Sequence, residues 1–411
     1  MRRVDETRAA ILDGISSLEA EYLPSAAGIG LRLAAPVCAV QPIPAFDSSA
    51  VDGYAVIASD TASASLDSPV SFRLTGASAA GGAPPQPVTP GTCVRILTGA
   101  PVPAGADAIV MQEDAEARSE TVLLHAPASQ GAYIRRAGAE CAAGTEVLSA
   151  GDRITAASIP LLVTASPAGA LFTRCPRVAV LTTGDEVLEA AEAGCIPYGG
   201  VVNTNRPMLT ALIHDAGAVC CESAHAADSL DDTERILSRF AAPPCEADVI
   251  IAAGGVSVGD RDFVKPAVEA LGSLDLWRVA VKPGKPFAFG RIGRTLFFGL
   301  PGNPASAFVT FTLFVLPALR KLAGARNPDR YRWVTAATER NLQCDEARDE
   351  YLRSTVEFGE HGATLHTADG QGSGMLISLA CANALALLPA GGGTVRAGEP
   401  VKAMLLTHGD G

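Results

Sequence analysis

The amino-acid sequence predicts a multidomain protein of the α/β plus β class. At 411 residues the chain is longer than one hydrophobic core usually supports, so about two to four domains are expected. Strand-like and helix-like segments alternate over residues 176–326, which indicates a mainly parallel sheet covered by helices. Short strand-like runs punctuated by glycine and proline precede and follow this region. They predict two further domains built from β-strands.

The first segment is predicted to begin with one amphipathic helix. Between residues 5 and 24, apolar side chains recur at helical spacing: Ala9, Leu12, Ile15, Leu18 and Leu23. A proline-punctuated connector follows, and a second short helix is expected before Pro176. Residues 1–45 and 148–175 are therefore assigned to a helical and extended linker domain.

Three further domains follow from the pattern of strands. Residues 46–147 predict a small β domain, because runs such as YAVIA and CVRIL are separated by clusters such as GGAPPQP. Residues 176–326 predict the α/β domain, in which the run VIIAA is typical of a strand buried on both faces. Residues 327–411 contain several short β-like runs and predict a C-terminal β-barrel. Ligands of an open parallel sheet bind at the carboxyl ends of its strands, and the glycine-rich loops fall there.

Composition excludes several classes of function. The net charge of −12 and the pI near 5.0 argue against nucleic-acid binding, which needs a basic face. No apolar run approaches the roughly 20 residues needed to span a bilayer, and the charged amino terminus differs from a secretory signal, so a cytoplasmic protein without membrane contact is expected. The ten cysteines form no C-x-x-C pair and the six histidines no H-x-x-x-H spacing. Reduced, mostly buried thiols are therefore predicted.

The stretch from Ala253 to Ser306 predicts a site for phosphate or another oxyanion. Three loops rich in glycine or proline each follow an apolar run and offer backbone N–H groups, lysines and hydroxyl groups. In VKPGKP, Lys282 and Lys285 flank a Pro-Gly turn that would direct two ammonium groups to one position. The alternative is a solvated turn with ordinary surface lysines. The segment is not a P-loop, because the first glycine of that motif would fall at Val279.

The glycine loop before this turn carries candidate acids. In AAGGVSVGDRDF, Gly254 and Gly255 permit close backbone approach and Ser257 adds a hydroxyl group. Asp260 and Asp262 stand just before a predicted helix. Each could bind a metal ion or cap the helix.

The loop LPGNPAS after the lysine turn begins another helix. Asn303 is predicted as its N-cap and Pro304 as its first residue. This arrangement would also direct free N–H groups and Ser306 toward a ligand in front of the helix, so the structural and functional interpretations are compatible.

Two other polar clusters have weaker signals. TTGDEV places Asp185 and Glu186 after a strand, where paired acids can hold Mg²⁺ or polarise a ligand, although a polar turn explains them equally well. Asp52 in DSSAVDGYAV and Thr98 in RILTGAPVPAGAD lie in segments typical of Asx and Pro/Gly turns.

Together these segments resemble the molybdopterin molybdenumtransferase family, which includes bacterial MoeA proteins and the E domain of gephyrin. The resemblance extends along nearly the whole chain and includes EYLR and GQGSGML near its end. It implies an elongated four-part subunit that forms a homodimer, with the active site between the molybdopterin-binding α/β domain of one subunit and the β domain of the other. It also implies Mg²⁺ as helper ion, molybdate and adenylylated molybdopterin as substrates, and molybdenum cofactor and AMP as products.

The resemblance assigns roles to individual residues by motif. Catalytic roles fall on Asp52, Glu186, Asp262 and Lys282, and metal binding on Asp248, Asp260 and Asp262. The substrate-binding positions are Thr98, Thr183, Gly184, Asp185, Gly254, Gly255, Ser257, Lys285, Pro301, Gly302, Asn303, Ser306, Arg353 and Ser373. Lysines, an arginine and hydroxyl groups suit a tetrahedral dianion such as molybdate, and carboxylates suit Mg²⁺ beside a developing pyrophosphate charge.

The chain departs from the family pattern at two positions, and two rival functions share part of the pattern. Glu140 replaces an aspartate common in the family, and Asn203 stands where a charge is often found. A molybdopterin adenylyltransferase acting one step earlier would share the α/β domain but lack the β domain and the barrel. A non-catalytic scaffold, as in gephyrin, would not require Asp52, Asp262 and the two lysines. A dehydrogenase is excluded because no G-x-G-x-x-G opens a helix. Transient contact with the adenylyltransferase or with molybdoenzyme apo-proteins is expected.

Overall fold

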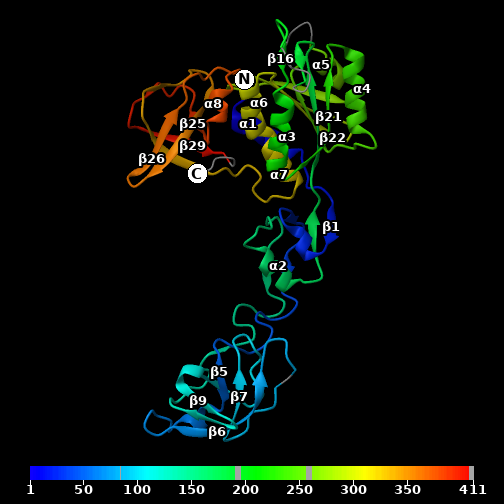
Figure 1. Ribbon diagram of the computed structural model, residues 1–411. Coiled ribbons are helices and arrows are strands. Elements are labelled where there is room, and N and C mark those ends of the chain that lie inside the picture. Colours follow the sequence, from blue (N-terminus) through cyan, green and yellow to red (C-terminus); the bar gives the residue numbers. More distant parts are fainter. Residues whose placement is uncertain (84, 190–195, 256–261, 407–411) are drawn as a thin grey trace.

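The computed structural model describes residues 1–83, 85–189, 196–255 and 262–406. The chain is elongated (Figure 1): a small β domain lies at one end, a slender linker domain in the middle, and an α/β domain beside a β-barrel at the other end. The predicted fold class, α/β plus β in an elongated multidomain subunit, is confirmed.

The linker domain combines two chain segments in short antiparallel sheets. One sheet has the order β1-β13-β2 and a second pairs β3 with β12. Its elements are β1 (Ala20–Leu23), η1 (Ser25–Gly28), β2 (Arg32–Leu33), β3 (Val37–Cys38), β12 (Glu146–Leu148), α2 (Ile159–Ala165) and β13 (Ala170–Thr173).

The helix predicted over residues 5–24 is shorter than expected. Helix α1 (Val4–Asp13) ends with Gly14 as its C-cap residue, and residues 20–23 instead pair with β13. The apolar spacing fitted one long helix, but pairing with a distant segment determines the second half. Helix α1 packs against the α/β domain, on α7 and η4.

The distal β domain is one six-stranded sheet in the order β8-β5-β7-β6-β10-β9, with the pair β11-β4 at its entry. Its elements are β4 (Ser48–Ser49), β5 (Gly53–Val56), η2 (Ala58–Thr61), β6 (Val70–Ser78), β7 (Thr92–Ile96), β8 (Ala108–Met111), η3 (Gln112–Asp114), β9 (Ala115–Arg118), β10 (Thr121–Leu124) and β11 (Ile134–Arg135). The central strands bury apolar side chains on both faces of this sheet, in two separate clusters.

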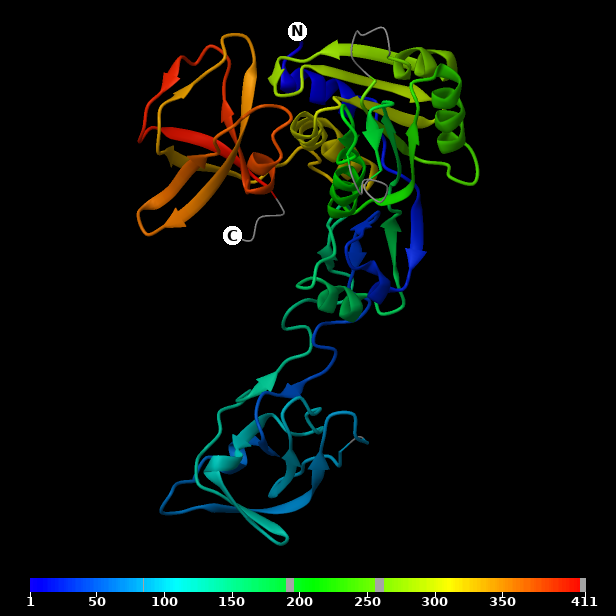
Figure 2. The ribbon, with the colours of Figure 1, turned by 45° about the horizontal axis from the view of Figure 1, so that its top comes forward.

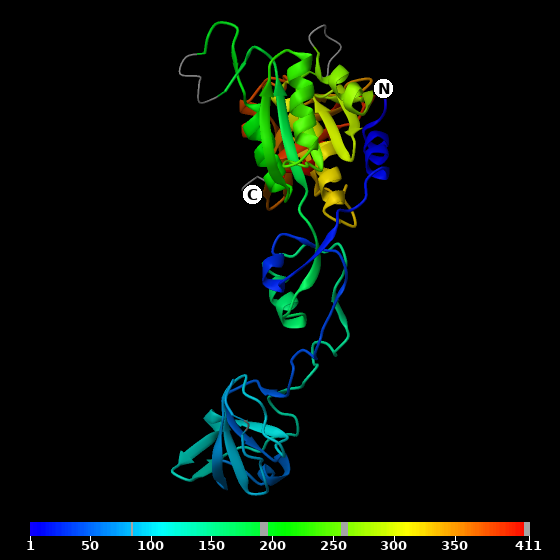
Figure 3. The same cartoon turned by 90° about the vertical axis from the view of Figure 1, so that its right-hand side faces the viewer.

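The α/β domain contains a six-stranded sheet in the order β17-β14-β18-β22-β21-β19. The first four strands of this order are parallel to one another. Strand β21 pairs antiparallel with β22, and β19 pairs antiparallel with β21. The prediction of a mainly parallel sheet is confirmed. Its elements are β14 (Arg177–Thr183), β15 (Val187–Leu188), β16 (Val201–Val202), α3 (Asn205–Asp215), β17 (Val219–Ala226), α4 (Leu230–Ala241), β18 (Val249–Ala253), α5 (Val264–Leu271), β19 (Ser273–Arg278), β21 (Pro286–Ile292) and β22 (Thr295–Leu300). Helices α4 and α5 cover one face, and α3 with the last helix of the domain covers the other (Figure 3).

That last helix runs without interruption through α6 (Pro304–Thr310), the π-helical turn η4 (Phe311–Val315) and α7 (Leu316–Leu322). The segment Pro304–Leu322 is 19 residues long and apolar enough to cross a membrane by length and composition, so the prediction that no such run exists was wrong. The window is 83% buried within the protein, as in a core helix. Pro317 lacks the N–H group that would bond the Leu313 carbonyl, and the Tyr331 hydroxyl lies 3.3 Å from that oxygen and 2.8 Å from the Thr312 carbonyl.

The C-terminal domain is a closed barrel. Its sheet has the order β20-β25-β26-β23-β29-β27, and an additional pairing of β25 with β27 closes the ring. Its elements are β23 (Trp333–Thr338), β24 (Leu342–Gln343), β25 (Asp349–Gly359), β26 (Gly362–Thr367), α8 (Ile377–Ala380), β27 (Ala384–Leu388), β28 (Thr394–Val395) and β29 (Pro400–Leu405). Strand β20 (Val281–Lys282) belongs to the lysine turn of the α/β domain and pairs in parallel with β25. The lysine turn is therefore joined to the barrel by a sheet.

The nine cysteines within the described residues are free thiols, but the expectation that most are buried was wrong. Cys93, Cys245 and Cys344 are buried, Cys38 and Cys381 are exposed, and the others are intermediate. Cys195 lies outside the described residues.

Candidate active site

The glycine loops meet at the carboxyl ends of three neighbouring strands. Thr183 ends β14, Gly254 follows β18 and Gly302 follows β22. A Cβ atom on Gly254 would lie 3.0 Å from Thr183 Oγ1, and one on Gly302 would lie 3.5 Å from the Gly254 Cα. Gly254 and Gly255 also have φ values of +98° and +66°, which favour glycine. The three loops therefore pack closely enough to form one backbone surface at this edge, with Pro301 at the start of the third.

Acidic side chains surround this edge. Gly184 has a φ of +127°, and a Cβ atom there would lie 2.8 Å from Glu186 Oε2, so the Glu186 carboxylate folds back over the loop. Asp185 accepts a hydrogen bond from the Asp228 backbone N–H at 3.0 Å. Both carboxylate oxygens of Asp262 are buried. Helix α5 starts at Val264 with Phe263 as its N-cap residue, so Asp262 does not occupy the N-cap position. Ser257 and Asp260 lie outside the described residues.

The lysine turn is tied to the barrel by an ion pair. Lys282 Nζ lies 2.9 Å from Glu350 Oε1, and the Glu350 side chain is only 8% exposed. Lys285 is exposed. Gly284 between them has a φ of +115°, and a Cβ atom there would lie 2.5 Å from Thr310 Cγ2. Close packing against α6 therefore fixes this turn, and Lys282 faces a carboxylate that sequence analysis did not identify.

The start of α6 contacts a loop of the barrel. Asn303 is the N-cap residue as predicted, but its side chain makes no cap bond and instead donates from Nδ2 to Ser373 Oγ at 3.0 Å. The Ala305 N–H donates to the Ser373 carbonyl at 3.1 Å, so one N–H group expected to face a ligand is occupied. Asn205 Nδ2 donates to the Gly302 carbonyl at 2.6 Å. Ser306 is buried in the first turn of α6.

Arg353 is fully buried beneath the loop that carries Ser373. Its Nε donates to Ser378 Oγ at 2.9 Å, and its Nη2 donates to the Gly372 carbonyl at 3.0 Å. Within the described residues its Nη1 group is buried without a hydrogen-bond partner. Burial lowers the pKa of the Arg353 guanidinium, and nearby Glu350 opposes this shift. Arg353 thus shapes the loop, while its buried Nη1 group has no hydrogen-bond partner among the described residues.

Asp52 and Thr98 form a pair in the distal β domain. Asp52 Oδ1 accepts from the Thr98 backbone N–H at 2.7 Å and from its hydroxyl at 2.8 Å. These bonds, the backbone one first, lower the pKa of the exposed Asp52 carboxyl. They lie beside β5 and β7, at the opposite end of the subunit from the lysine turn (Figure 2). One chain therefore does not bring all the predicted catalytic residues together.

Asp248 does not belong to the predicted metal site. It precedes β18 and so lies at the amino end of the strand, away from the glycine loops. Its two oxygens accept from Arg174 Nη1 and Nη2 at 2.7 Å each, and Oδ2 also accepts from the Arg177 backbone N–H at 2.8 Å. These bonds raise the pKa of Arg174. Asp248 is a structural ion-pair residue, and its assignment to Mg²⁺ was wrong.

The two departures from the family pattern have different settings. Glu140 is exposed, so its extra methylene group meets solvent. Asn203 is buried and donates from Nδ2 to Thr182 Oγ1 at 2.8 Å and to Glu189 Oε1 at 3.0 Å. An aspartate could not donate these bonds, so the neutral side chain matches its surroundings.

Among the described residues, no group of three or more His, Cys, Asp or Glu side chains is arranged to hold a metal ion. Mg²⁺ is commonly held by one or two carboxylates together with substrate phosphates and water. The buried Asp262 carboxylate and the Glu186 carboxylate are the described groups that fit such a site.

Sequence analysis missed Glu350 and Asn205. Glu350 is the first residue of the motif EYLR, but only the pairing of β20 with β25 places it against Lys282. Asn205 holds the Gly302 carbonyl, and its Oδ1 is buried without a hydrogen-bond partner among the described residues.

Comparison with known proteins agrees with this arrangement. Residues 2–166 match the MoeA N-terminal region (domain I and II), residues 179–321 a probable molybdopterin binding domain, and residues 335–406 the MoeA C-terminal region (domain IV). A molybdopterin molybdenumtransferase of Haemophilus influenzae is 32% identical, with 99% of each chain covered. The chain belongs to the MoeA family of molybdopterin molybdenumtransferases. The predicted family and transferase class are confirmed, and the MoeA N-terminal and C-terminal regions argue against the adenylyltransferase alternative.

Other members extend the comparison. Gephyrin of Dictyostelium discoideum is 34% identical over 99% of this chain, which spans 62% of the length of that protein. The crystal structure of the molybdopterin biosynthesis moeA protein from Pyrococcus horikoshii OT3 superposes with a TM-score of 0.82 at 27% identity, over 99% of this chain and all of the other. The MoeA fold of this chain therefore extends over its whole length.

Proposed function

We propose that this MoeA-family chain transfers molybdenum from molybdate to adenylylated molybdopterin and releases AMP with the help of Mg²⁺. The observation that carries the proposal is the junction of the α/β domain with the barrel. There Lys282, Ser373 and the spare Nη1 donor of Arg353 come from segments joined by strand pairing and hydrogen bonds. Such cationic and hydroxyl donors suit a tetrahedral dianion.

The acids at the edge of the sheet have a complementary role. In this proposal Glu186 and Asp262 hold Mg²⁺ together with oxygens of the adenylate. When bound, Mg²⁺ neutralises charge that develops on the phosphate oxygens. The backbone of Gly254 and Gly302 lies at the strand ends, where open sheets bind ligands.

A homodimer would complete the site. Asp52 and Thr98 lie at the far end of the chain from Lys285 (Figure 2), so a role for both requires that a second subunit supply one set. Hydrogen bonds from Thr98 lower the pKa of the Asp52 carboxyl and so favour its anionic form.

AMP release from adenylylated molybdopterin, measured at increasing molybdate concentration with Mg²⁺, tests the activity. Replacing Lys285 by Ala should raise the molybdate concentration needed for half-maximal release by about tenfold or more, because a charge-assisted hydrogen bond contributes about 1.5–3 kcal/mol. Lys402→Ala removes an exposed lysine from the barrel strand β29 and should change nothing. No AMP release by the unmodified chain would contradict the proposed activity, and equal molybdate dependence in both variants would contradict the proposed anion site.

Complementation tests the shared site. Asp52→Ala and Lys285→Ala chains are refolded together and assayed at a limiting molybdate concentration, at which each variant alone releases little AMP in this proposal. Random pairing should restore up to about one quarter of the activity, because half of the dimers are mixed and each mixed dimer has one intact site. Mixed dimers that form but stay inactive would place all these residues in one subunit's site.

A further inference from the structure

A cavity lies at the opposite end of the sheet from the candidate active site. It has a volume of about 420 Å³ and is bordered by the linker domain, α3, α7 and the last residues of β29. Arg174 and Cys175, which precede β14, also line it. It is therefore near the amino end of β14, whereas the glycine loops follow the carboxyl ends of the strands. Its volume is within the range of small-molecule sites.

The lining of this cavity is strongly cationic. Two acidic residues, Asp152 and Asp215, line it. Seven arginines line it as well: Arg32, Arg153, Arg174, Arg320, Arg326, Arg330 and Arg332. The whole chain carries 44 acidic and 32 basic residues, so this concentration of positive charge runs against the overall balance. We call it the arginine cavity.

Three of these arginines donate to backbone carbonyls and have no acidic partner among the described residues. Arg174 is neutralised by Asp248 and Glu19, and Arg326 pairs with Asp152. By contrast, no carboxylate among the described residues is within ion-pair distance of Arg32, Arg153 or Arg320. These three donate instead to backbone carbonyls: Arg32 to Gly151 at 2.9 Å, Arg153 to Gly30 at 3.2 Å and Arg320 to Arg330 at 3.0 Å.

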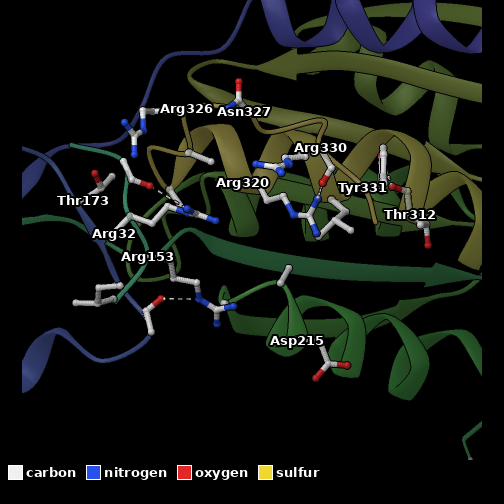
Figure 4. Close-up of a pocket in the computed structure, with 18 of the residues that line it drawn as sticks. Arg32, Arg153, Thr173, Asp215, Thr312, Arg320, Arg326, Asn327, Arg330 and Tyr331 are labelled. Atoms are coloured by element: carbon white, nitrogen blue, oxygen red, sulfur yellow. Dashed lines mark hydrogen bonds between the residues drawn. The ribbon is translucent and has the colours of Figure 1, made fainter. Parts of the chain in front are cut away.

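These three side chains come from separate elements and enter the same space (Figure 4): Arg32 from β2, Arg153 from the segment before α2, and Arg320 from α7. Burial lowers the pKa of the Arg32 guanidinium, and repulsion by Arg153 and Arg320 lowers it further. Burial, with repulsion by Arg153, also lowers the pKa of Arg320. Holding like charges together in a partly buried place is unfavourable unless an anion compensates them.

The remaining wall is partly apolar. Leu212, Phe311 and Leu316 contribute apolar surface. The Tyr331 ring lies between two cations, with the guanidinium carbons of Arg8 and Arg320 each 5.7 Å from its centroid. A ligand could therefore place charged groups among the arginines and an organic part against this wall.

We propose that the arginine cavity binds a phosphate-bearing small-molecule anion through Arg32, Arg153 and Arg320. Guanidinium groups bind phosphate oxygens through paired hydrogen bonds. Three uncompensated guanidinium groups favour a ligand with more than one negative charge, so a phosphate or diphosphate fits better than a single carboxylate. The ligand would join the linker domain to α7 and so stabilise the junction between the two domains.

Calorimetric titration of the full chain tests this site, with inorganic phosphate, pyrophosphate and ADP as probes and chloride at matched ionic strength. Pyrophosphate should bind and raise the melting temperature, and it should do so equally in a Lys285→Ala chain, which separates this cavity from the candidate active site. Stronger binding of ADP than of pyrophosphate in that chain would identify an organic phosphate as the ligand. The reverse order would identify an inorganic one.

Variants locate the binding to the cavity. Arg32→Gln and Arg153→Gln should each weaken pyrophosphate binding about tenfold or more. Without ligand they should melt at or above the temperature of the parent, because repulsion among the arginines is relieved. Arg118→Gln, in the distal β domain, is the control and should bind normally.

Four results would overturn the proposal. The first is that pyrophosphate does not bind, and the second is that it binds Arg32→Gln and Arg153→Gln as tightly as the parent. Binding that disappears in Lys285→Ala would place pyrophosphate in the active site. A polyglutamate peptide that binds where pyrophosphate does not would assign the cavity to an acidic protein segment.

Discussion

Replacement of Asp248 by Asn separates a structural role from metal binding. The Asp248 carboxylate holds both Nη groups of Arg174 at 2.7 Å and the Arg177 backbone N–H at 2.8 Å. Asparagine has nearly the same shape but carries no charge and has one side-chain oxygen in place of two. The substitution should therefore break the paired interaction while leaving the volume of the site unchanged.

The expected cost lies between two limits. Breaking a buried ion pair costs about 3–5 kcal/mol, and an exposed pair contributes about 0–1 kcal/mol. The Asp248 side chain is 12% exposed and that of Arg174 25%, so the pair is closer to the buried limit. Arg174 keeps a second partner, because Glu19 lies 2.7 Å from its Nε. We expect Asp248→Asn to lower the free energy of unfolding by about 2–3 kcal/mol.

Urea unfolding followed by tryptophan fluorescence measures this loss. Trp277 and Trp333, the two tryptophans of the chain, lie in β19 and β23, so the signal reports on the α/β domain and the barrel. A loss of this size should lower the urea midpoint by about 1 M, whereas Asp275→Asn, at an exposed position of β19, should not. Mg²⁺ dependence of AMP release should stay unchanged. A normal urea midpoint combined with a tenfold higher Mg²⁺ requirement would refute this reasoning and return Asp248 to the metal site.

Three further outcomes are expected. Gly284→Ala should cost about 2–4 kcal/mol through backbone strain and overlap with α6, measured by thermal unfolding, and unchanged stability would contradict the packing of the lysine turn. Asn203→Asp places a carboxylate beside Glu189 and should lower the melting temperature at pH 7 more than at pH 4, where protonation relieves the repulsion; an equal loss at both pH values would point to another cause. NMR titration should place the pKa of the Asp52 carboxyl below its usual range. The stability from its Thr98 bonds is therefore present above the pKa of the unfolded chain and is lost as the pH falls through the pKa of the folded chain. In Thr98→Val the titration should move upward, and no movement would show that the side-chain hydroxyl contributes nothing.

Most of the candidate site could be predicted from the sequence, because ligands of parallel sheets bind at the carboxyl ends of the strands. Glycine-rich loops after apolar runs lie at strand carboxyl ends, and Thr183, Gly254 and Gly302 do meet there. The same rule, applied consistently, would have excluded Asp248, because that residue precedes the run VIIAA and must lie at the other end of the strand.

The remaining differences depend on contacts between distant segments. Nothing near Lys282 in the sequence indicates that Glu350 faces it, because their meeting follows from the pairing of β20 with β25. Likewise the apolar spacing of residues 5–24 fits a helix, and only the pairing of residues 20–23 with β13 turns the second half into a strand. The arginine cavity could not be predicted at all, since its residues come from segments that are far apart in the chain.

The two proposed anion sites also differ in how the positive charge of their side chains is balanced. In the candidate active site Lys282 is already paired with the buried Glu350 carboxylate, so part of its charge is committed before any ligand arrives. In the arginine cavity Arg32, Arg153 and Arg320 donate to neutral carbonyl groups and repel one another. An anion should therefore increase stability more by entering the arginine cavity than by entering the active site. Phosphate that stabilises the chain without competing with molybdate is the behaviour that this imbalance predicts.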